Sequence, residues 1–281
     1  RNWAMAGGLD VVFASRRGNY LGSLVGGSST SKADRVRAQI RIQDLPEGLD
    51  IARSIITAKV RKQIVVLQRF GRREHADLVR DAIAAMQQVL LILPDCTSTA
   101  EAMGVEGAAA AAYFPAFGAL FPEGLRFDHR TRQPPLDVAN SALSFLYTIL
   151  LGECVSALYA AGLDPAFGVL HRDHDNRPSL ALDLLEELRP LIADQVVLSA
   201  ARVGALKADH GRTEDGRAGI MLTKAGREAI LSAYERRMLT MTRGALPDFA
   251  GSLRRHVYRQ AQRLATAIVS PGTPWTGLSW R

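Results

Sequence analysis

The stretch HRDHDNRPSLALDLLEELRP, residues 171–190, places a histidine ahead of a polar loop and three carboxylates within a leucine-rich helix. At 100° per residue the leucines fall on one broad side of this helix, while Asp183, Glu186 and Glu187 gather on another. A solvated acidic face explains that pattern without any chemistry, and the helix dipole alone favours Asp183 near the N-terminus. Two interpretations therefore stay open: half of a metal site, or the wet side of an ordinary amphipathic helix.

Outward from this stretch, helical spacing of apolar residues dominates the chain from Pro46 onward. After a first helix from Pro46, further helices are predicted at residues 74–93, 98–118, 137–161, 180–188, 192–204, 224–242 and 248–268. Two β-prone runs, LDVVFAS and YLGSLVGG, come earlier, and RVRAQIRIQ suits a strand or a helix. The fold class predicted is α+β, with a small, incomplete β domain over residues 1–45 and a large, mainly helical domain over 46–281.

Composition and charge narrow the class of protein. With 281 residues, 47% of them hydrophobic, the chain can bury a sizeable core. Its 35 Lys and Arg against 28 Asp and Glu give a formal charge of +7, which favours a polyanionic partner such as nucleic acid. Cys96 and Cys154 lack the spacing of a zinc site and the density of a disulfide scaffold, so we expect a cytoplasmic location.

One apolar stretch, residues 142–163, is long enough to cross a bilayer. It carries Ser144, Thr148, Glu153 and Ser156 and lacks basic flanks of the usual sort. It therefore predicts a buried helix and no membrane partner. The final stretch, SPGTPWTGLSWR, predicts an extended segment whose tryptophans dock on the body or await a partner.

A second acidic candidate lies in TSTAEAMGVEGAAAAAYF. Ser98 and Glu101 have the spacing of a capping box, which explains Glu101 structurally. Glu106 has no such explanation, and the small residues around it, Gly104 and Gly107 among them, would let another helix approach and bury its side chain. A buried carboxylate without a structural role is a site candidate, although a solvated position for Glu106 stays open.

Histidine and basic residues complete the set of candidates. His171 follows the apolar run DPAFGVL, where a histidine more often packs in the core than binds a metal. A histidine with two carboxylates nevertheless suits Mn²⁺ and tolerates Mg²⁺. Arg255, Arg259 and Arg263 form one stripe at i, i+4 and i+8, which is either a solvated face or a phosphate track. The cluster KVRKQ is interpreted as an extension of that basic surface.

Four blocks, VEGAAAAAYFPAF, PPLDVANSALSFLYTILL, AGLDPAFGVLH and RPSLALDLLEELRP, occur in this order and together resemble the core signatures of the Cas1 family of CRISPR-associated integrases. The resemblance runs from near residue 10 to about residue 250. It implies a β-sandwich-like N-terminal domain followed by an α-helical catalytic domain. The chain opens without an initiator Met and with less strand sequence than family members have, so we expect an N-terminally incomplete piece, as one cut from a fusion protein would be.

The same resemblance assigns roles to residues. It implies a site for Mg²⁺ or Mn²⁺ built from Glu106, His171 and Glu186, supported by Asp183 and Arg189. The DNA-binding residues expected, as cavity-lining positions or as the basic stripe, are Asn140, Ser144, Tyr147, Arg255, Arg259 and Arg263. Glu187, His174 and Asp175 are expected to be ordinary solvated residues.

The function that the resemblance implies is a metal-dependent DNA endonuclease and integrase. It would insert short DNA fragments into a CRISPR repeat array by attack of a 3′-hydroxyl on a phosphodiester. The expected partners are double-stranded DNA, a second copy of the chain in a homodimer, and a small ferredoxin-like protein of the Cas2 family. Two alternatives remain: a noncatalytic DNA-binding scaffold, and a mobile-element integrase on the same catalytic domain.

Overall fold

The computed structural model of the protein describes residues 11–14, 20–24, 33–71, 75–214 and 216–280. Its strands are β1 (Val11–Ala14), β2 (Tyr20–Leu24), β3 (Gly211–Glu214), β4 (Arg217–Leu222), β5 (Met241–Leu246) and β6 (Phe249–Ser252). Its α-helices are α2 (Ala33–Ile42), α3 (Pro46–Phe70), α4 (Ala76–Ile92), α5 (Thr99–Ala119), α6 (Val138–Ala160), α7 (Ser179–Leu188), α8 (Gln195–Arg202), α9 (Lys224–Met238) and α10 (Leu253–Val269). A π-helical turn, η3 (Arg189–Asp194), joins α7 to α8.

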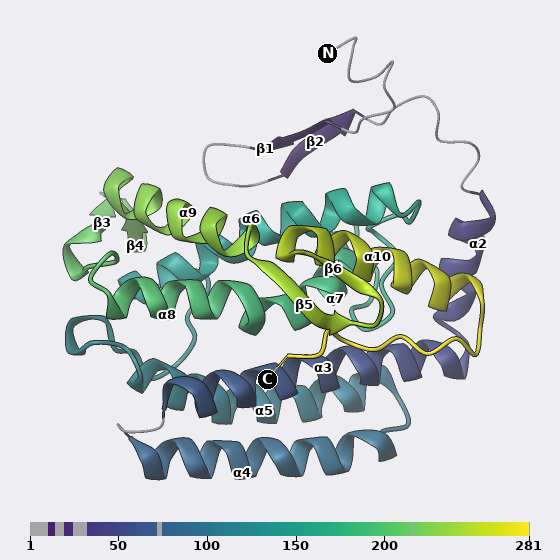
Figure 1. Ribbon diagram of the computed structural model, residues 1–281, viewed down its shortest axis with the longest axis horizontal. Coiled ribbons are helices and arrows are strands. Elements are labelled where there is room, and N and C mark those ends of the chain that lie inside the picture. Colours follow the sequence, from purple (N-terminus) through teal and green to yellow (C-terminus); the bar gives the residue numbers. More distant parts are fainter. Residues whose placement is uncertain (1–10, 15–19, 25–32, 72–74, 215, 281) are drawn as a thin grey trace.

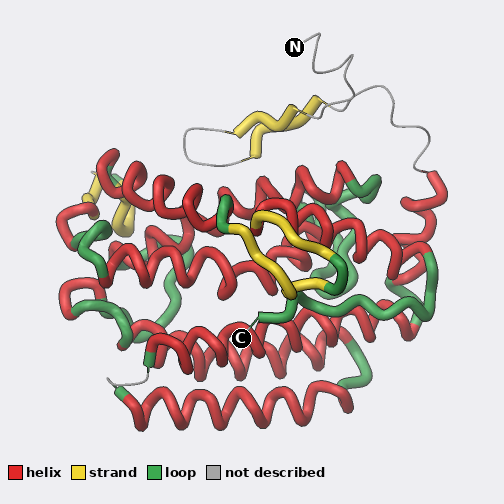
Figure 2. Tube along the Cα trace, in the orientation of Figure 1, coloured by secondary structure: helices red, strands yellow, loops and turns green. Residues whose placement is uncertain are grey.

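Helices make up most of the described residues, and the strands form three small antiparallel pairs (Figure 2). In Figure 1, α3, α4 and α5 lie across the lower part of the molecule, α7 and α8 lie in the middle, and α6 and α9 lie above them. α3 packs against α5 and α7, and α6 packs against α7 and α10. The mainly helical body is therefore confirmed, and α7 lies at its centre.

The N-terminal region is described in part. The pair β1–β2 is antiparallel, and β1 contacts α6. Apart from these two strands, the β domain predicted over residues 1–45 lies outside the described residues as far as residue 32. Residues 35–42, for which strand and helix were both open, belong to α2, which packs against α10. The domain boundary at residue 46 stays a prediction.

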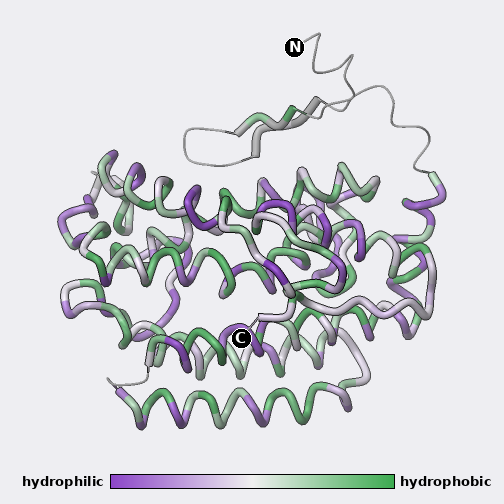
Figure 3. Tube along the Cα trace, in the orientation of Figure 1, coloured by the Kyte–Doolittle hydropathy of each residue, from purple (hydrophilic) through white to green (hydrophobic). Residues whose placement is uncertain are grey.

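Burial explains why the central helices form where they do. Four leucines of α7 are at most 1% exposed, as the opening stretch predicts for its apolar side: Leu180, Leu184, Leu185 and Leu188. α6 is long and apolar enough to cross a membrane by composition, and half of the apolar window concerned is buried within the protein. Along α4, hydrophobic and hydrophilic residues alternate around the helix (Figure 3), as expected for a helix packed on one side. Both cysteines are free and buried.

Two predicted helices near the C-terminus are too long. α9 ends at Met238 and α10 begins at Leu253, because residues between them form the hairpin β5–β6. Asp248 follows Pro247 at the turn with φ of 54°, a left-handed conformation that Asp tolerates in tight turns. The spacing of apolar residues alone does not report such a turn.

Candidate metal centre

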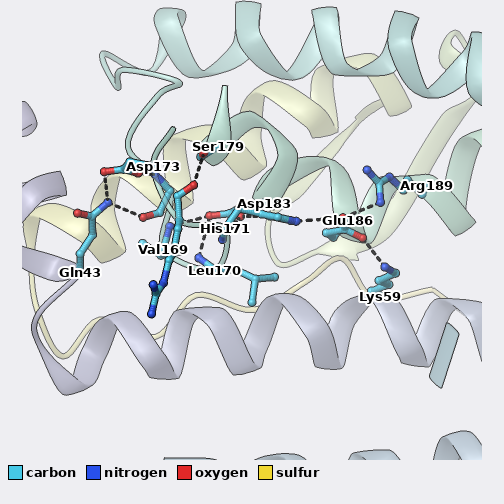
Figure 4. A network of polar contacts seen from close by, with 12 residues as sticks. Gln43, Lys59, Val169, Leu170, His171, Asp173, Ser179, Asp183, Glu186 and Arg189 are labelled. Carbon is cyan, nitrogen blue, oxygen red and sulfur yellow. Dashed lines mark hydrogen bonds and ion pairs between the residues drawn. The ribbon is translucent and has the colours of Figure 1, made fainter. Parts of the chain in front are cut away.

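Asp183 and His171 form the best-defined part of the site (Figure 4). From the first half of α7, the carboxylate of Asp183 accepts backbone N–H groups from Val169 at 2.7 Å, Leu170 at 3.0 Å and His171 at 3.0 Å. It also lies 2.6 Å from Nδ1 of the His171 ring. An ionised carboxylate only accepts, so Nδ1 carries a hydrogen, and Nε2 is the ring nitrogen that faces Glu186.

A glycine permits this close approach. A Cβ on Gly168 would lie 2.4 Å from the carbonyl oxygen of His171 and 3.1 Å from Oδ2 of Asp183. The turn that delivers His171 to α7 therefore requires the absence of a side chain at Gly168. The amide of Gln43 donates to the Gly168 carbonyl at 2.7 Å and so ties the start of this turn to the end of α2.

Three helices bring Glu106, Glu186 and Lys59 together. Lys59, from the middle of α3, places Nζ 2.5 Å from Oε1 of Glu106 on α5 and 2.5 Å from Oε2 of Glu186 on α7. The side chains are 7% exposed for Lys59, 24% for Glu106 and 5% for Glu186. Nε2 of His171 lies 4.0 Å from Oε1 of Glu186. Two of the three predicted ligands thus contact one lysine ammonium, and the third, His171, lies beside Glu186.

The charge of Glu186 is strongly stabilised. Burial would raise the pKa of this carboxyl, but the neighbouring cations Arg189 and Lys59, with His171, outweigh it and lower the pKa to about 2. Nη1 of Arg189 donates to Oε1 of Glu186 at 2.6 Å. Glu186 is therefore an anion at any ordinary pH, as a metal ligand must be.

The donors fit a divalent cation. Oε2 of Glu186 is buried and has the Lys59 ammonium, at 2.5 Å, as its ion-pair partner. Two carboxylates and one imidazole nitrogen suit Mn²⁺ and tolerate Mg²⁺. With Lys59 in place, no three His, Cys, Asp or Glu side chains of the described residues form a preformed metal cluster. Glu106 and Glu186 contact the Lys59 ammonium, and His171 lies beside Glu186.

The surroundings of Glu106 differ from expectation. The sequence predicted that another helix would pack closely over Gly104 and Gly107, but a Cβ at either glycine would meet nothing within 4 Å. The Glu106 side chain contacts Lys59, and the surface of α5 beside it, at Gly104 and Gly107, is uncovered. Ser98 is confirmed as the N-cap, since its Oγ accepts the Glu101 N–H at 3.2 Å, whereas the Glu101 carboxylate accepts the Thr97 N–H at 2.6 Å.

Behind Glu186, a second network fixes Arg189. The Arg189 guanidinium lies 5.0 Å from the centroid of the Tyr147 ring. The Tyr147 hydroxyl donates to Asp194 at 2.6 Å, and the Tyr113 hydroxyl donates to the same carboxylate at 2.9 Å. Arg189 and Asp194 are the two ends of the π-helical turn, a form that recurs at functional sites. Arg189, predicted to support the site, and Tyr147, predicted to line the cavity, are thus in contact with each other.

Asn140 and Ser144 hold an arginine that sequence reasoning missed. Arg130 donates to Asn140 Oδ1 at 2.9 Å and to Ser144 Oγ at 2.8 Å, and its guanidinium lies 5.3 Å from the Tyr147 ring centroid. Asn140 is fully buried. In this conformation its side-chain amide positions Arg130.

The three arginines of the basic stripe on α10 differ in their contacts. Arg255 and Arg259 are exposed, and Arg259 donates to Gln262 in the same helix, at 3.0 Å. Arg263 is half-buried and binds Thr276 through both its carbonyl and its hydroxyl at 2.8 Å. Two of the three arginines therefore offer free charge to solvent, and the third fastens the C-terminal segment.

Two interpretations of charged residues are wrong. Lys59 and Lys62, taken as part of a basic surface, are 6% and 3% exposed. Glu187, taken as solvated, is fully buried and accepts Lys62 Nζ at 2.9 Å and the amide of Gln260 at 2.6 Å. A sequence signal existed: Lys59 and Lys62 fall at i+4 and i+7 from Ile55, on the apolar stripe of α3.

Comparison with known proteins agrees with the resemblance seen in the sequence. The family model described as CRISPR associated protein Cas1 matches residues 1–236. A CRISPR-associated endonuclease Cas1 of Rhodospirillum rubrum is 40% identical over 271 residues, which cover 92% of this chain and 78% of the relative. A Cas4/Cas1 fusion of the same organism is 34% identical over 92% of this chain and 45% of the fusion.

Solved structures share the fold. A CAS1 protein from Thermotoga maritima matches with a TM-score of 0.77 and 22% identity, over 100% of this chain and 84% of that one. A casposase bound to integration product matches with a TM-score of 0.80 and 23% identity, over 98% and 76%. A chain of a Cas6-RT-Cas1–Cas2 complex matches with a TM-score of 0.80 and 26% identity, over 99% of this chain and 31% of that one.

Proposed function

Because the chain belongs to the Cas1 family of CRISPR-associated endonucleases, we propose that it is a metal-dependent DNA integrase that joins short DNA fragments to a CRISPR repeat array. The observation that carries this proposal is the meeting of Glu106 from α5 and Glu186 from α7 on one buried ammonium, with Nε2 of His171 4.0 Å from Glu186. Lys59 compensates the charge of the two carboxylates, and their oxygens with the nearby imidazole nitrogen form a donor set that suits a divalent ion.

The chain's residues would divide the work of strand transfer. Glu106, His171 and Glu186 would hold a divalent ion, which supplies positive charge at the phosphorus oxygens and makes the attacking 3′-hydroxyl more nucleophilic. Asp183 keeps the His171 ring in place, and Arg189 holds Glu186 charged and oriented. If His171 leaves the ion, Nε2 can instead accept the hydroxyl proton.

The open surface of α5 and the net charge support DNA as the partner. Gly104 and Gly107 border Glu106 without a covering side chain, so a DNA strand can reach the site from that side. Arg255 and Arg259 and the formal charge of +7 favour contacts to the phosphate backbone. A homodimer and a Cas2 partner complete the proposal, on the analogy of the Cas6-RT-Cas1–Cas2 complex.

The test is Mn²⁺-dependent strand transfer by the full chain. Glu186→Gln and His171→Ala should each lower the rate about 100-fold or more, because each removes a donor to the ion. His174→Ala is the matched control, since His174 lies in the same loop and its Nδ1 contacts only the Asp175 carbonyl among the described residues, at 2.9 Å. Wild-type rates in Glu186→Gln or His171→Ala contradict the proposal.

The target distinguishes a CRISPR integrase from a mobile-element integrase on the same domain. The casposase likeness, at 23% identity, is one of fold alone. Products that require a repeat–leader target and a Cas2 partner support the CRISPR function. Equal products on a target without a repeat, with no Cas2 present, favour the mobile-element alternative.

A further inference from the structure

Two parallel ion pairs join α3 to α7. Lys59 pairs with Glu186 and Lys62 pairs with the next residue, Glu187, at N–O distances of 2.5 Å and 2.9 Å. Both lysine side chains are nearly inaccessible, at 7% and 4% exposure. One turn of helix separates them, so they form a natural pair for comparison.

The two lysines differ in what surrounds their carboxylates. Glu187 is fully satisfied: it accepts Lys62, the amide of Gln260 and the backbone N–H of Leu278. Glu106 has Lys59 as its one hydrogen-bond or ion-pair partner within the described residues. Lys62 therefore belongs to a closed structural network, whereas Lys59 belongs to the candidate metal centre.

Lys59 and a divalent ion would compete for one position. The ammonium lies at 2.5 Å from an oxygen of Glu106 and from one of Glu186. Mg²⁺ takes such oxygens at about 2.0–2.1 Å. A dication in contact with both carboxylates would therefore meet the ammonium at short range, and like charges repel strongly in so buried a place.

We propose, resting on the metal site of the proposed function, that Lys59 is an internal cation that holds Glu106 and Glu186 together until a divalent ion displaces its ammonium. Lys59 then acts as a positioning residue: it compensates the two carboxylates, which come from α5 and α7, before the metal arrives. It also weakens metal binding, because the ion must break two ion pairs. Lys62 has neither role.

The first test labels lysines in the wild-type chain. The protein is treated briefly with acetic anhydride, in EDTA and in saturating Mn²⁺, and acetylation at Lys59 and Lys62 is measured by mass spectrometry. Displacement predicts that Mn²⁺ raises acetylation of Lys59 several-fold and leaves Lys62 unchanged. If calorimetry shows that Mn²⁺ binds while Lys59 stays as protected as Lys62, the inference is wrong.

The second test measures Mn²⁺ affinity in variants. Lys59→Met keeps the length of the side chain and removes its charge, so the Kd for Mn²⁺ should fall about tenfold while the metal-free Tm falls. Lys62→Met should lower the Tm and leave the Kd unchanged. An unchanged or higher Kd in Lys59→Met overturns the inference. If the wild type binds no Mn²⁺, or Glu106→Gln binds it equally well, the metal site itself is wrong.

Discussion

At the residue scale, Asp183 connects the fold to the chemistry. Its carboxylate accepts hydrogen bonds from three backbone N–H groups and holds the His171 ring in place. Asp183→Asn places an amide donor against these donors, so we expect the free energy of unfolding in urea to fall by about 2–4 kcal/mol. Strand transfer should also fall, because His171 loses its orientation.

Asp173→Asn is the matched control for that change. Asp173 accepts the Gly168 N–H at 2.9 Å and the Gln43 amide at 2.9 Å, but it is exposed. Its loss should cost less than about 1 kcal/mol, as for exposed hydrogen bonds. Equal costs for Asp183→Asn and Asp173→Asn would show that burial of Asp183 is unimportant.

A pH dependence follows from the lowered pKa of Glu186. The pKa falls from 4.5 to about 2 in the folded protein, so the ionised form stabilises the fold above pH 4.5, and this contribution disappears as the pH falls toward 2. The contribution is on the order of 3 kcal/mol. In urea titrations with EDTA, the stability difference between wild type and Glu186→Gln should shrink from pH 6 to pH 3. A constant difference would contradict this assignment.

Single residues also show where sequence reasoning stops. Glu106 was a candidate from the sequence alone, but only the resemblance to a family joined Glu106, His171 and Glu186 in one predicted site. An acidic helix face and a histidine beside the core have ordinary explanations. Lys59 was missed because lysines in a basic cluster are usually solvated. Only the crossing of α3, α5 and α7 makes its burial necessary, and crossings of helices cannot be obtained from the spacing within one helix.

At the element scale, the π-helical turn after α7 places Asp194 under two tyrosines. Burial raises the pKa of Asp194, and the hydroxyls of Tyr147 and Tyr113 are its hydrogen-bond donors. Tyr147→Phe and Tyr113→Phe should each cost about 1–3 kcal/mol in urea unfolding. The double variant should lose more unfolding free energy than the sum of the two single losses, because both tyrosine hydroxyls that donate to the buried Asp194 carboxylate are then gone.

Tyr234→Phe provides the control for these tyrosines. The Tyr234 hydroxyl is buried and has no hydrogen-bond partner in the described part of the chain, so its removal should be neutral or slightly stabilising. A loss for Tyr234→Phe as large as that for Tyr147→Phe would mean that the ring environment, not the bond to Asp194, sets the cost.

Elements differ in how well the sequence predicts them. α5, α6 and α7 begin and end within about two residues of their predictions, because side-chain caps mark the starts of α5 and α6 and apolar spacing marks α7. The hairpin β5–β6 was missed because apolar residues continue through it, and the π-helical turn because its residues suit an α-helix equally well. Both depend on contacts with distant residues, which override local preference.

At the scale of the whole molecule, the C-terminal segment connects elements that are far apart in sequence. Trp275 and Leu278 are buried, and the Leu278 N–H donates to Glu187 beside the candidate site. The Ser279 N–H donates to the Ala245 carbonyl of β5 at 2.8 Å. The segment runs across α3 to the C-terminus (Figure 1). Docking through a buried tryptophan confirms the first of the two predicted alternatives, and it makes the segment part of the core.

Gly277 is the point at which this docking is most easily broken. A Cβ there would lie 2.4 Å from Cβ of Ala58 on α3 and 2.7 Å from Oε2 of Glu187. Gly277→Ala should therefore lift the segment, lower the free energy of unfolding by about 1–3 kcal/mol and red-shift tryptophan fluorescence as Trp275 meets water. Gly152→Ala, in a helix where a Cβ meets nothing within 4 Å, should instead stabilise by about 0.5–1 kcal/mol. Unchanged stability and fluorescence in Gly277→Ala would show that the segment does not need its close contact with α3 and α7.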